Sequence, residues 1–449
     1  MDSDYIHKLF NFLFSPYGIL SIFIGLIVLE KARHSTRIRW LLFSLCCYAA
    51  SLGKFKDKWV EESPPLVFPL QQMRDVGRPL TILLLAVLLL LALQTKNGWR
   101  RNVIPQPLIY LALVQVVIFF KIFFYGNIMF ALQAAITFGA VMLMVKLGPS
   151  RWLQNENNVQ LGICSLAMTG VIFVTICTYQ GIFNMYAMTF HHGRFLGTTG
   201  NPIHASTLLS IIIPCLMFMI EIRRRWDWMK FFWIGFLVVN IYFLFLTGSR
   251  TGMLMGITSI LLFYRNRIGM FLRFCLFISL ILGIGFSFVS PDLLTNNYTF
   301  LSNRYVLGEN TREGAWQGMW TNFLNYPFFG SPLIGERLGF GESSWLAIAA
   351  TTGLLGLIPL TMMGLECLKM MLKLHHLGTT KPVYFLHTST VISGLTALLV
   401  GSFGEPFLLA NLTFPVIALM FYLSLGKYLL DLNYQEKVYG FSANLYGIK

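Results

Sequence analysis

The feature that most constrains this chain is the recurrence of long apolar segments separated by short basic ones. A transmembrane helix needs roughly 20 mainly apolar residues. Segments that meet or approach this length lie at residues 79–95, 103–120, 127–146, 159–180, 202–220, 231–247, 251–264, 270–290, 344–368, 383–400 and 406–426. Two earlier stretches, residues 16–29 and 40–52, are short for a full crossing. The pattern predicts an all-α, polytopic membrane protein with about 12–14 transmembrane helices.

Composition supports this class, since 56% of the 449 residues are hydrophobic, 12% are charged and the mean hydropathy is +0.65. The formal net charge of +15 would suit a nucleic-acid surface in a polar chain. Here the basic residues lie between apolar segments, so we expect no nucleic-acid partner. Basic clusters in short loops mark the cytoplasmic side of a membrane. Such clusters follow alternate spans and include Lys31, Arg33, Lys96, Arg100, Lys146, Arg151, Arg223, Arg224, Arg265, Arg267, Lys373 and Lys381.

The same alternation assigns the intervening loops to the outer face of the membrane. Those loops cover residues 181–201, 248–250, 291–343 and 401–405. The predicted divisions are N-terminal spans (1–158), spans that carry two arginine loops (159–290), a large periplasmic loop (291–343), and C-terminal spans with a cytoplasmic tail (344–449). The Trp, Tyr, Pro and Gly content of the large loop suits a small cap over the membrane face.

A glycine-rich outer loop, beginning at His191 and His192, leads into the span at 202–220. Asn201 is a favourable N-cap and Pro202 a favourable first helical residue, so backbone N–H groups would face outward beside Arg194. A helix start of this kind is a natural anion site. The alternative is a flexible loop whose arginine reaches lipid headgroups.

A second arginine lies between two apolar segments with almost nothing separating them. Ser249 and Arg250 occupy this break, and an arginine so near hydrocarbon marks either a substrate pathway or a structural ion pair. Gly252 and Gly256 follow at a spacing that indicates close helix packing more than a dimer face.

Two further groups come from the large outer loop and its end. Arg312 precedes Trp316 and the segment Pro327 to Gly330, and Glu342 precedes the span at 344–368. A carboxylate at a helix start is either a dipole-stabilised cap or a catalytic base. Three arginines and one glutamate would thus converge beside a capped helix start.

This combination suits glycosyl transfer from a lipid diphosphate. Cations and N–H donors would stabilise the departing diphosphate, and a carboxylate would take the proton of the attacking sugar hydroxyl. The only Asp-x-Asp pattern is Asp2 to Asp4 at the extreme N-terminus, so we predict a metal-independent reaction with no cofactor.

These residues also carry a resemblance to a known family. The series is Arg194-x-x-Gly197-x-x-Gly200-Asn201-Pro202, Thr247-Gly248-Ser249-Arg250, Arg312 with Trp316 and Pro327 to Gly330, and Glu342-Ser343-x-Trp345-Leu346 with Thr352-Gly353-Leu354-Leu355-Gly356. In order and spacing it resembles the O-antigen polymerase and O-antigen ligase superfamily over residues 160–425. Members are membrane glycosyltransferases, similar to the GT-C architecture, that use undecaprenyl-pyrophosphate-linked glycans at the outer face.

The resemblance implies roles for individual residues. Arg194 and Arg250, helped by Asn201 and Ser249, would contact the donor pyrophosphate. Arg312 would be a further phosphate or sugar contact, and Glu342 the base. Ligase-like members usually carry His at the position of Glu342, so the resemblance favours an inverting polymerase of lipid-linked repeat units in lipopolysaccharide or related polysaccharide synthesis.

Other assignments stay open at this stage. Candidate acceptor contacts are His204, Glu405 and Trp345; the alternatives are a helix-interface histidine, a solvated turn residue and an interfacial anchor. The rival functions are a ligase that transfers the glycan to lipid A-core or another acceptor, and a transporter or flippase for lipid-linked oligosaccharide. Expected partners are the bilayer and the lipid-linked donor and acceptor glycans, with a chain-length regulator and a flippase as candidates.

Overall fold

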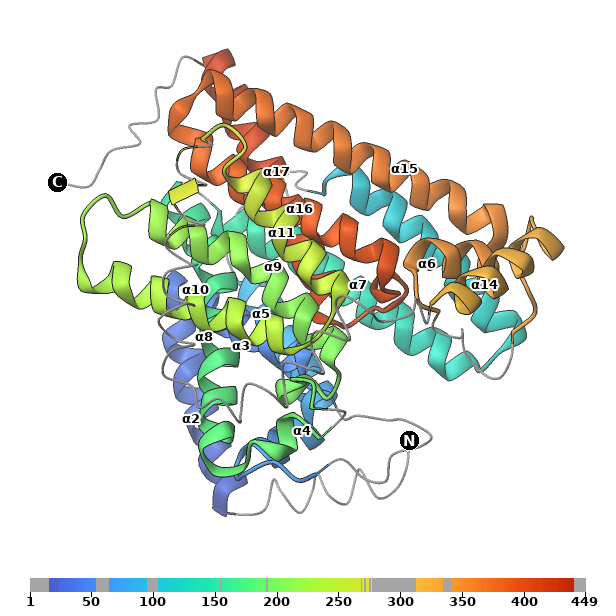
Figure 1. Cartoon of the computed structure of the whole chain (residues 1–449), viewed down its shortest axis with the longest axis horizontal. Coiled ribbons are helices and arrows are strands. Elements are labelled where there is room, and N and C mark those ends of the chain that lie inside the picture. The colour runs from blue at the N-terminus through green and yellow to red at the C-terminus, as the bar shows by residue number, and fades with distance from the viewer. Residues whose placement is uncertain are drawn as a thin grey trace.

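The computed structural model describes residues 16–53, 64–94, 104–153, 156–190, 193–267, 312–333 and 341–439, together with residues 269, 272, 273 and 276. Within these residues the chain is helical and contains no strand (Figure 1). The main helices are α2 (Pro16–His34), α3 (Thr36–Ser51), α5 (Gly77–Leu93), α6 (Gln106–Tyr125), α7 (Ile128–Trp152), α8 (Glu156–Asn184), α9 (Pro202–Glu221), α10 (Trp228–Leu246), α11 (Arg250–Phe263), α14 (Glu313–Asn325), α15 (Ser344–Thr380), α16 (Phe385–Gly404) and α17 (Phe414–Tyr439).

Eight helices of the described part are long and apolar enough to cross a membrane. They are α6, α7, α8, α9, α10, α15, α16 and α17, and α5 and α11 are shorter apolar helices. The prediction of an all-helical, multi-pass membrane protein is confirmed. Most of the predicted span at 270–290 and most of the predicted cap at 291–343 lie outside the described residues.

The last predicted span differs from the structure at its start. The helix begins at Phe414 and not at residue 406, because the apolar residues before it form a loop with a short 3-10 turn, Phe407–Leu409. The backbone of Leu408 is satisfied from outside this loop: its N–H donates to Ser344 Oγ (3.2 Å) and its carbonyl accepts from Gln115 Nε2 (3.1 Å). An apolar pattern alone cannot distinguish such a buried loop from the first turns of a helix.

Helix starts lie where the sequence places capping side chains. Asn201 accepts from the N–H of Ile203 (2.8 Å) at the start of α9. Ser249 caps α11, with its hydroxyl accepting at 3.2 Å, and Ser343 caps α15 at 3.4 Å. Each cap satisfies one N–H that the first helical turn leaves without an intrahelical partner. All three precede helices that begin at the candidate functional site.

Helix α9 is the centre of the bundle and packs against α8, α10, α11 and α16. Its contact with α11 depends on small residues: a Cβ on Gly252 would lie 2.3 Å from Ser206 Cβ of α9, and one on Gly256 would lie 3.4 Å from Ile213 Cδ1 of α9 and 3.0 Å from Leu244 Cδ2 of the neighbouring α10. The glycine spacing therefore serves close packing within the chain, as predicted.

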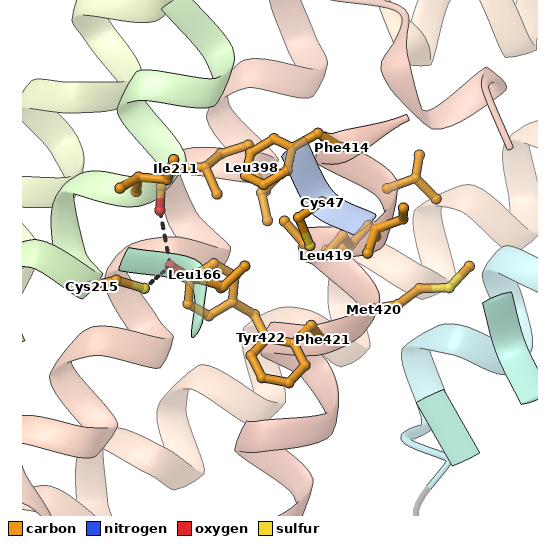
Figure 2. Packing of buried hydrophobic residues seen from close by; sticks show 14 of the residues in the cluster. Cys47, Leu166, Ile211, Cys215, Leu398, Phe414, Leu419, Met420, Phe421 and Tyr422 are labelled. Atoms are coloured by element: carbon orange, nitrogen blue, oxygen red, sulfur yellow. Dashed lines mark hydrogen bonds between the residues drawn. The ribbon is translucent and has the colours of Figure 1, made fainter. Parts of the chain in front are cut away.

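Tyr422 joins α17 to α9 in the buried core (Figure 2). Its hydroxyl donates to the carbonyl of Ile211 (2.9 Å) and lies 3.0 Å from Cys215 Sγ. The ring fits because position 394 is glycine, where a Cβ would lie 2.3 Å from the ring. This contact helps to fix α16 and α17 against α9, and α16 ends at the site described next.

Candidate functional site

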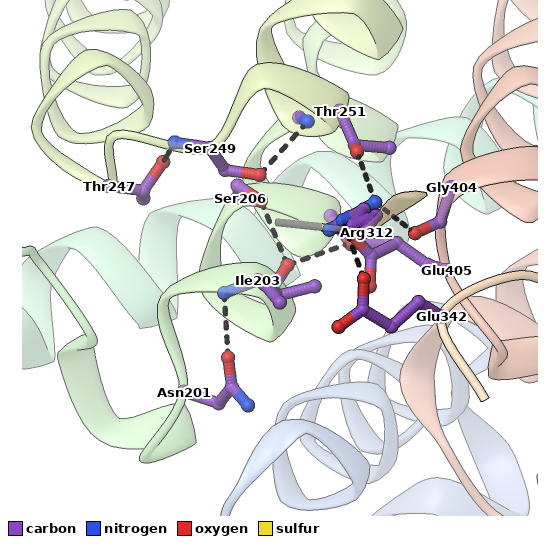
Figure 3. A network of polar contacts seen from close by, with 12 residues as sticks. Asn201, Ile203, Ser206, Thr247, Ser249, Thr251, Arg312, Glu342, Gly404 and Glu405 are labelled. Atoms are coloured by element: carbon purple, nitrogen blue, oxygen red, sulfur yellow. Dashed lines mark hydrogen bonds and ion pairs between the residues drawn. The ribbon is translucent and has the colours of Figure 1, made fainter. Parts of the chain in front are cut away.

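Arg312 joins four segments that are far apart in the sequence (Figure 3). Its Nη1 donates to Thr251 Oγ1 (3.0 Å) on α11 and to the carbonyl of Gly404 at the end of α16. Its Nη2 donates to Glu405 Oε1 (2.7 Å), and its Nε lies 3.3 Å from Glu342 Oε2. We call these five residues the carboxylate junction. Within it, one arginine faces two carboxylates.

The two carboxylates differ in access. The side chain of Glu405 is 7% exposed, whereas that of Glu342 is 44% exposed. Glu405 follows the last residue of α16, and its carbonyl accepts from Ser344 Oγ (2.6 Å) and from the Ser344 N–H (3.2 Å) at the start of α15. Glu405 is thus a buried structural partner of Arg312, which excludes the solvated-turn interpretation. Glu342 is the more exposed of the two carboxylates, although its Oε2, which faces Arg312, is buried.

The pKa of Glu405 is raised to about 7, mainly by burial and to a smaller extent by the neighbouring Glu342 carboxylate, while Arg312 and a hydrogen bond from Thr251 partly oppose this rise. The protonated carboxyl is the form that burial favours. Because the unfolded chain would ionise near the usual value of 4.5, the contribution of Glu405 to stability is greatest below that pH. It declines as the pH rises to about 7.

We therefore expect a pH-dependent difference between the wild-type protein and Glu405→Gln. From about pH 5 to about pH 8, the melting temperature of the wild type should fall relative to that of the variant, which carries no ionisable group at this position. Thermal unfolding in detergent at both pH values measures this difference. If the melting temperatures of the two proteins changed equally with pH, Glu405 could not be a buried group that takes up a proton on folding.

Helix α15 is broken near its start, and the break orients the part that borders the carboxylate junction. Gly353 has φ +63° inside the helix. A Cβ there would lie 2.5 Å from the backbone of Phe328, so glycine is required for the close approach of the two segments as well as for the positive φ. The turn that contains Phe328 follows α14, which lies beside the start of α15 in Figure 1.

Backbone groups released by the break find partners in that turn. The N–H of Leu354 donates to the carbonyl of Pro327 (2.7 Å), and the carbonyl of Ala350 accepts from the Ser331 N–H (2.8 Å). Lys121 Nζ, from α6, donates to the carbonyls of Phe329 (2.9 Å), Ser331 (2.7 Å) and Thr351. Where the backbone of a membrane protein is irregular, hydrogen bonds of this kind must replace the missing intrahelical ones. The Pro327–Gly330 and Thr352–Gly356 motifs therefore have a structural role, since they hold the first part of α15 in place.

Replacing Lys121 with methionine should loosen this connection. The substitution removes all three donors of one ammonium group, and we expect the free energy of unfolding to fall by about 2 kcal/mol. Thermal unfolding checks the change, with Lys369→Met as a control, because Lys369 on α15 is exposed and pairs only locally with Glu366 (2.7 Å). Equal melting temperatures for the two variants would contradict the assigned role.

The glycine-rich loop before α9 lies against the start of α11. Arg194 is buried, and its Nε donates to the carbonyl of Thr247 (2.8 Å). The N–H of Phe195 donates to the carbonyl of Leu246 (3.0 Å). Arg194 thus fixes the turn that ends in Ser249, a contact that snorkelling to lipid headgroups would not give. His191 and His192 lie outside the described residues.

The remaining predicted site residues are two helix caps, two exposed residues and one packed tryptophan. Asn201 and Ser249 use their side chains as helix caps, and Arg250 is exposed as the first residue of α11. His204 is exposed on the first turn of α9. Trp345 packs between helices instead: its Nε1 donates to Ser402 Oγ (2.9 Å), and its ring stacks on Phe403 at 5.1 Å. These contacts give Trp345 a packing role against α16, which neither the acceptor interpretation nor the interfacial-anchor interpretation predicted.

The structure joins Arg312 to Glu342, as the sequence predicted, and links Arg194 to the Thr247–Arg250 turn. It adds Thr251, Glu405 and Lys121 to the network. The predicted span ended at residue 120, but residues 122–125 are apolar as well. Extending that span would have placed Lys121 inside it, and a lysine within an apolar span is a signal of function or of a structural partner, so Lys121 could have been found from sequence. Its carbonyl partners could not. Among the described residues, no group of three or more His, Cys, Asp or Glu side chains could hold a metal ion.

The fold and this site define a multi-pass helical membrane protein with an arginine–carboxylate network at one end of its bundle. No protein-family model matches the chain, and no curated protein matches it.

Proposed function

We propose that the chain is an integral membrane glycosyltransferase that polymerises oligosaccharide repeat units carried on undecaprenyl pyrophosphate, at the outer face of the bacterial inner membrane. The single observation that carries the proposal is the carboxylate junction, in which an accessible Glu342 is held beside Arg312. General-base catalysis requires a carboxylate that is reachable and oriented. The family resemblance of the surrounding motifs supplies the substrate class.

In the proposed reaction, the acceptor sugar hydroxyl attacks the anomeric carbon of the donor glycan. The hydroxyl proton passes to Glu342, the new glycosidic C–O bond forms, and the bond from the anomeric carbon to the diphosphate oxygen breaks. The electron pair leaves with the lipid diphosphate. Direct displacement inverts the anomeric configuration, and diphosphate needs no general acid to leave.

The contacts favour separate places for the acceptor and for the diphosphate. Arg312 is already engaged by two carboxylates, and its role in the proposal is to orient Glu342. The N-terminal ends of α9 and α11 would suit a diphosphate better than Arg312 does, because the helix N-termini and Arg250 supply positive charge there. Arg194 would act by holding the turn before Arg250.

The test is to incubate the purified, reconstituted protein with one lipid-pyrophosphate-linked oligosaccharide and to separate the products by size. A ladder of multiples supports a polymerase. A product that forms only with a second acceptor would point to a ligase, and no product with any acceptor would leave transport of the lipid-linked glycan as the function to test.

We also expect this synthesis to continue in the presence of EDTA, because the proposed chemistry uses side-chain cations where other enzymes use a metal. The ladder assay with and without chelator, followed by addition of magnesium, measures this directly. Loss of the ladder in EDTA with recovery in magnesium would contradict it.

A further inference from the structure

A groove lies at the opposite end of α15 from the carboxylate junction. It is an open groove of about 590 Å³ between α15 and α17. The groove residues that matter for its chemistry are Leu372, Lys373, His376, Lys427, Leu430 and Tyr434. Both helices are apolar enough to span a membrane, so the groove opens on a wall that would face the bilayer.

The length of α15 would place the groove at the depth of lipid headgroups if the start of the helix lies near the opposite membrane surface. At 1.5 Å per residue, the stretch of α15 from Ser344 to Lys373 extends roughly 40 Å. The hydrocarbon core of a bilayer is about 30 Å thick. If Ser344 lies near one membrane surface, then Lys373 lies beyond the hydrocarbon on the other side.

The lining combines positive charge with exposed apolar surface. Lys373, His376 and Lys427 provide nitrogen donors, and Lys427 Nζ pairs with Asp431 Oδ1 at 2.7 Å. The large apolar side chains of Leu372 and Tyr434 are 68% and 66% exposed, so the groove presents apolar surface. A phospholipid matches both properties, because its phosphate suits the cations and its glycerol and upper acyl region suit the apolar residues.

We propose that this groove binds the headgroup of an anionic phospholipid from the surrounding leaflet. The phosphate contacts Lys373 and Lys427, with His376 as an additional donor. The acyl chains extend along the exposed faces of α15 and α17 past Leu372. Asp431 competes with the lipid for Lys427 and lowers its affinity. This site is separate from the carboxylate junction and does not depend on the function proposed for it.

Native mass spectrometry of the full-length, delipidated protein tests the proposal. We would titrate dioleoylphosphatidylglycerol, which is anionic, against dioleoylphosphatidylcholine, which carries the same chains on a zwitterionic headgroup. The wild type should retain the anionic lipid in preference to the zwitterionic one. Lys373→Gln and Lys427→Gln should each weaken its binding about fivefold, the effect expected for one basic residue near a lipid surface, and Asp431→Asn should strengthen it.

Lys369→Gln is the matched control, since Lys369 lies on α15 outside the groove and pairs with Glu366. It should leave lipid retention unchanged, and melting temperatures identify any variant that fails to fold. Equal retention of the two lipids, or unchanged binding in both groove lysine variants, would overturn the proposal. Displacement of the lipid by inorganic phosphate alone would also overturn it, because the groove would then be a site for free anions.

Discussion

Replacing Arg312 with glutamine is expected to abolish polymer synthesis and to lower the free energy of unfolding by about 3 kcal/mol. The guanidinium is the shared partner of Glu342 and Glu405, and Glu405 is buried. Its removal leaves Glu342 without its cation and leaves the buried Glu405 either as an unpaired charge or as a protonated carboxyl that has lost its hydrogen-bond donor, and both outcomes cost stability. Thermal unfolding of the purified variant and the ladder assay measure the two effects separately.

A second substitution distinguishes the structural part of this loss from the catalytic part. In Arg312→Gln combined with Glu405→Gln, the buried charge is gone, so most of the lost stability should return. Polymer synthesis should not return, because Glu342 still lacks the group that orients it. Recovery of activity in the double variant would show that Arg312 serves only to neutralise Glu405.

Replacing Glu342 with glutamine should reduce turnover by a factor of roughly 10² to 10⁴, the usual contribution of a general base. Glutamine has nearly the same shape and keeps an oxygen that can accept from Arg312, but it cannot take the proton of the acceptor hydroxyl. Since Glu342 is 44% exposed, the melting temperature should change little. Initial rates at saturating lipid-linked oligosaccharide check the prediction.

Glu313→Gln is a suitable control for this experiment. Glu313 directly follows Arg312 in the chain, lies in the first turn of α14 and is exposed. It is an acidic residue like Glu342 but is not one of the five residues of the carboxylate junction, so its variant should retain activity. If Glu342→Gln kept more than about a tenth of the wild-type rate, a base other than Glu342 would be required.

The local features of the site were predictable because they depend on nearest neighbours in the chain. Asn201, Ser249 and Ser343 have capping side chains directly before apolar segments, and all three cap helices. The spacing of Gly252 and Gly256 predicted close helix packing, and a Cβ at either position would meet a neighbouring helix. Such patterns operate over a few residues, so the sequence contains the whole signal.

The pairing of Glu405 with Arg312 was not predictable in the same way. The two residues are 93 positions apart, and a Gly-Glu-Pro segment has the composition of an exposed turn. Burial of Glu405 arises because α11, α15 and α16 meet at this point and close over the carboxylate. The three carbonyls around Lys121 likewise come from a turn and from a break in α15 that hydropathy cannot detect.

The sequence by itself determined that this chain is a helical membrane protein, approximately where most of its helices lie, and that Asn201 caps α9. Hydrophobic length and helix capping are local properties, and a bilayer requires every spanning backbone group to be paired within its own helix or with close neighbours. Only the tertiary structure decided which carboxylate is reachable and which is buried, and that Arg312 engages both. Those outcomes depend on contacts between helices that are far apart in the sequence, and the free energy of such contacts cannot be inferred from any one segment alone.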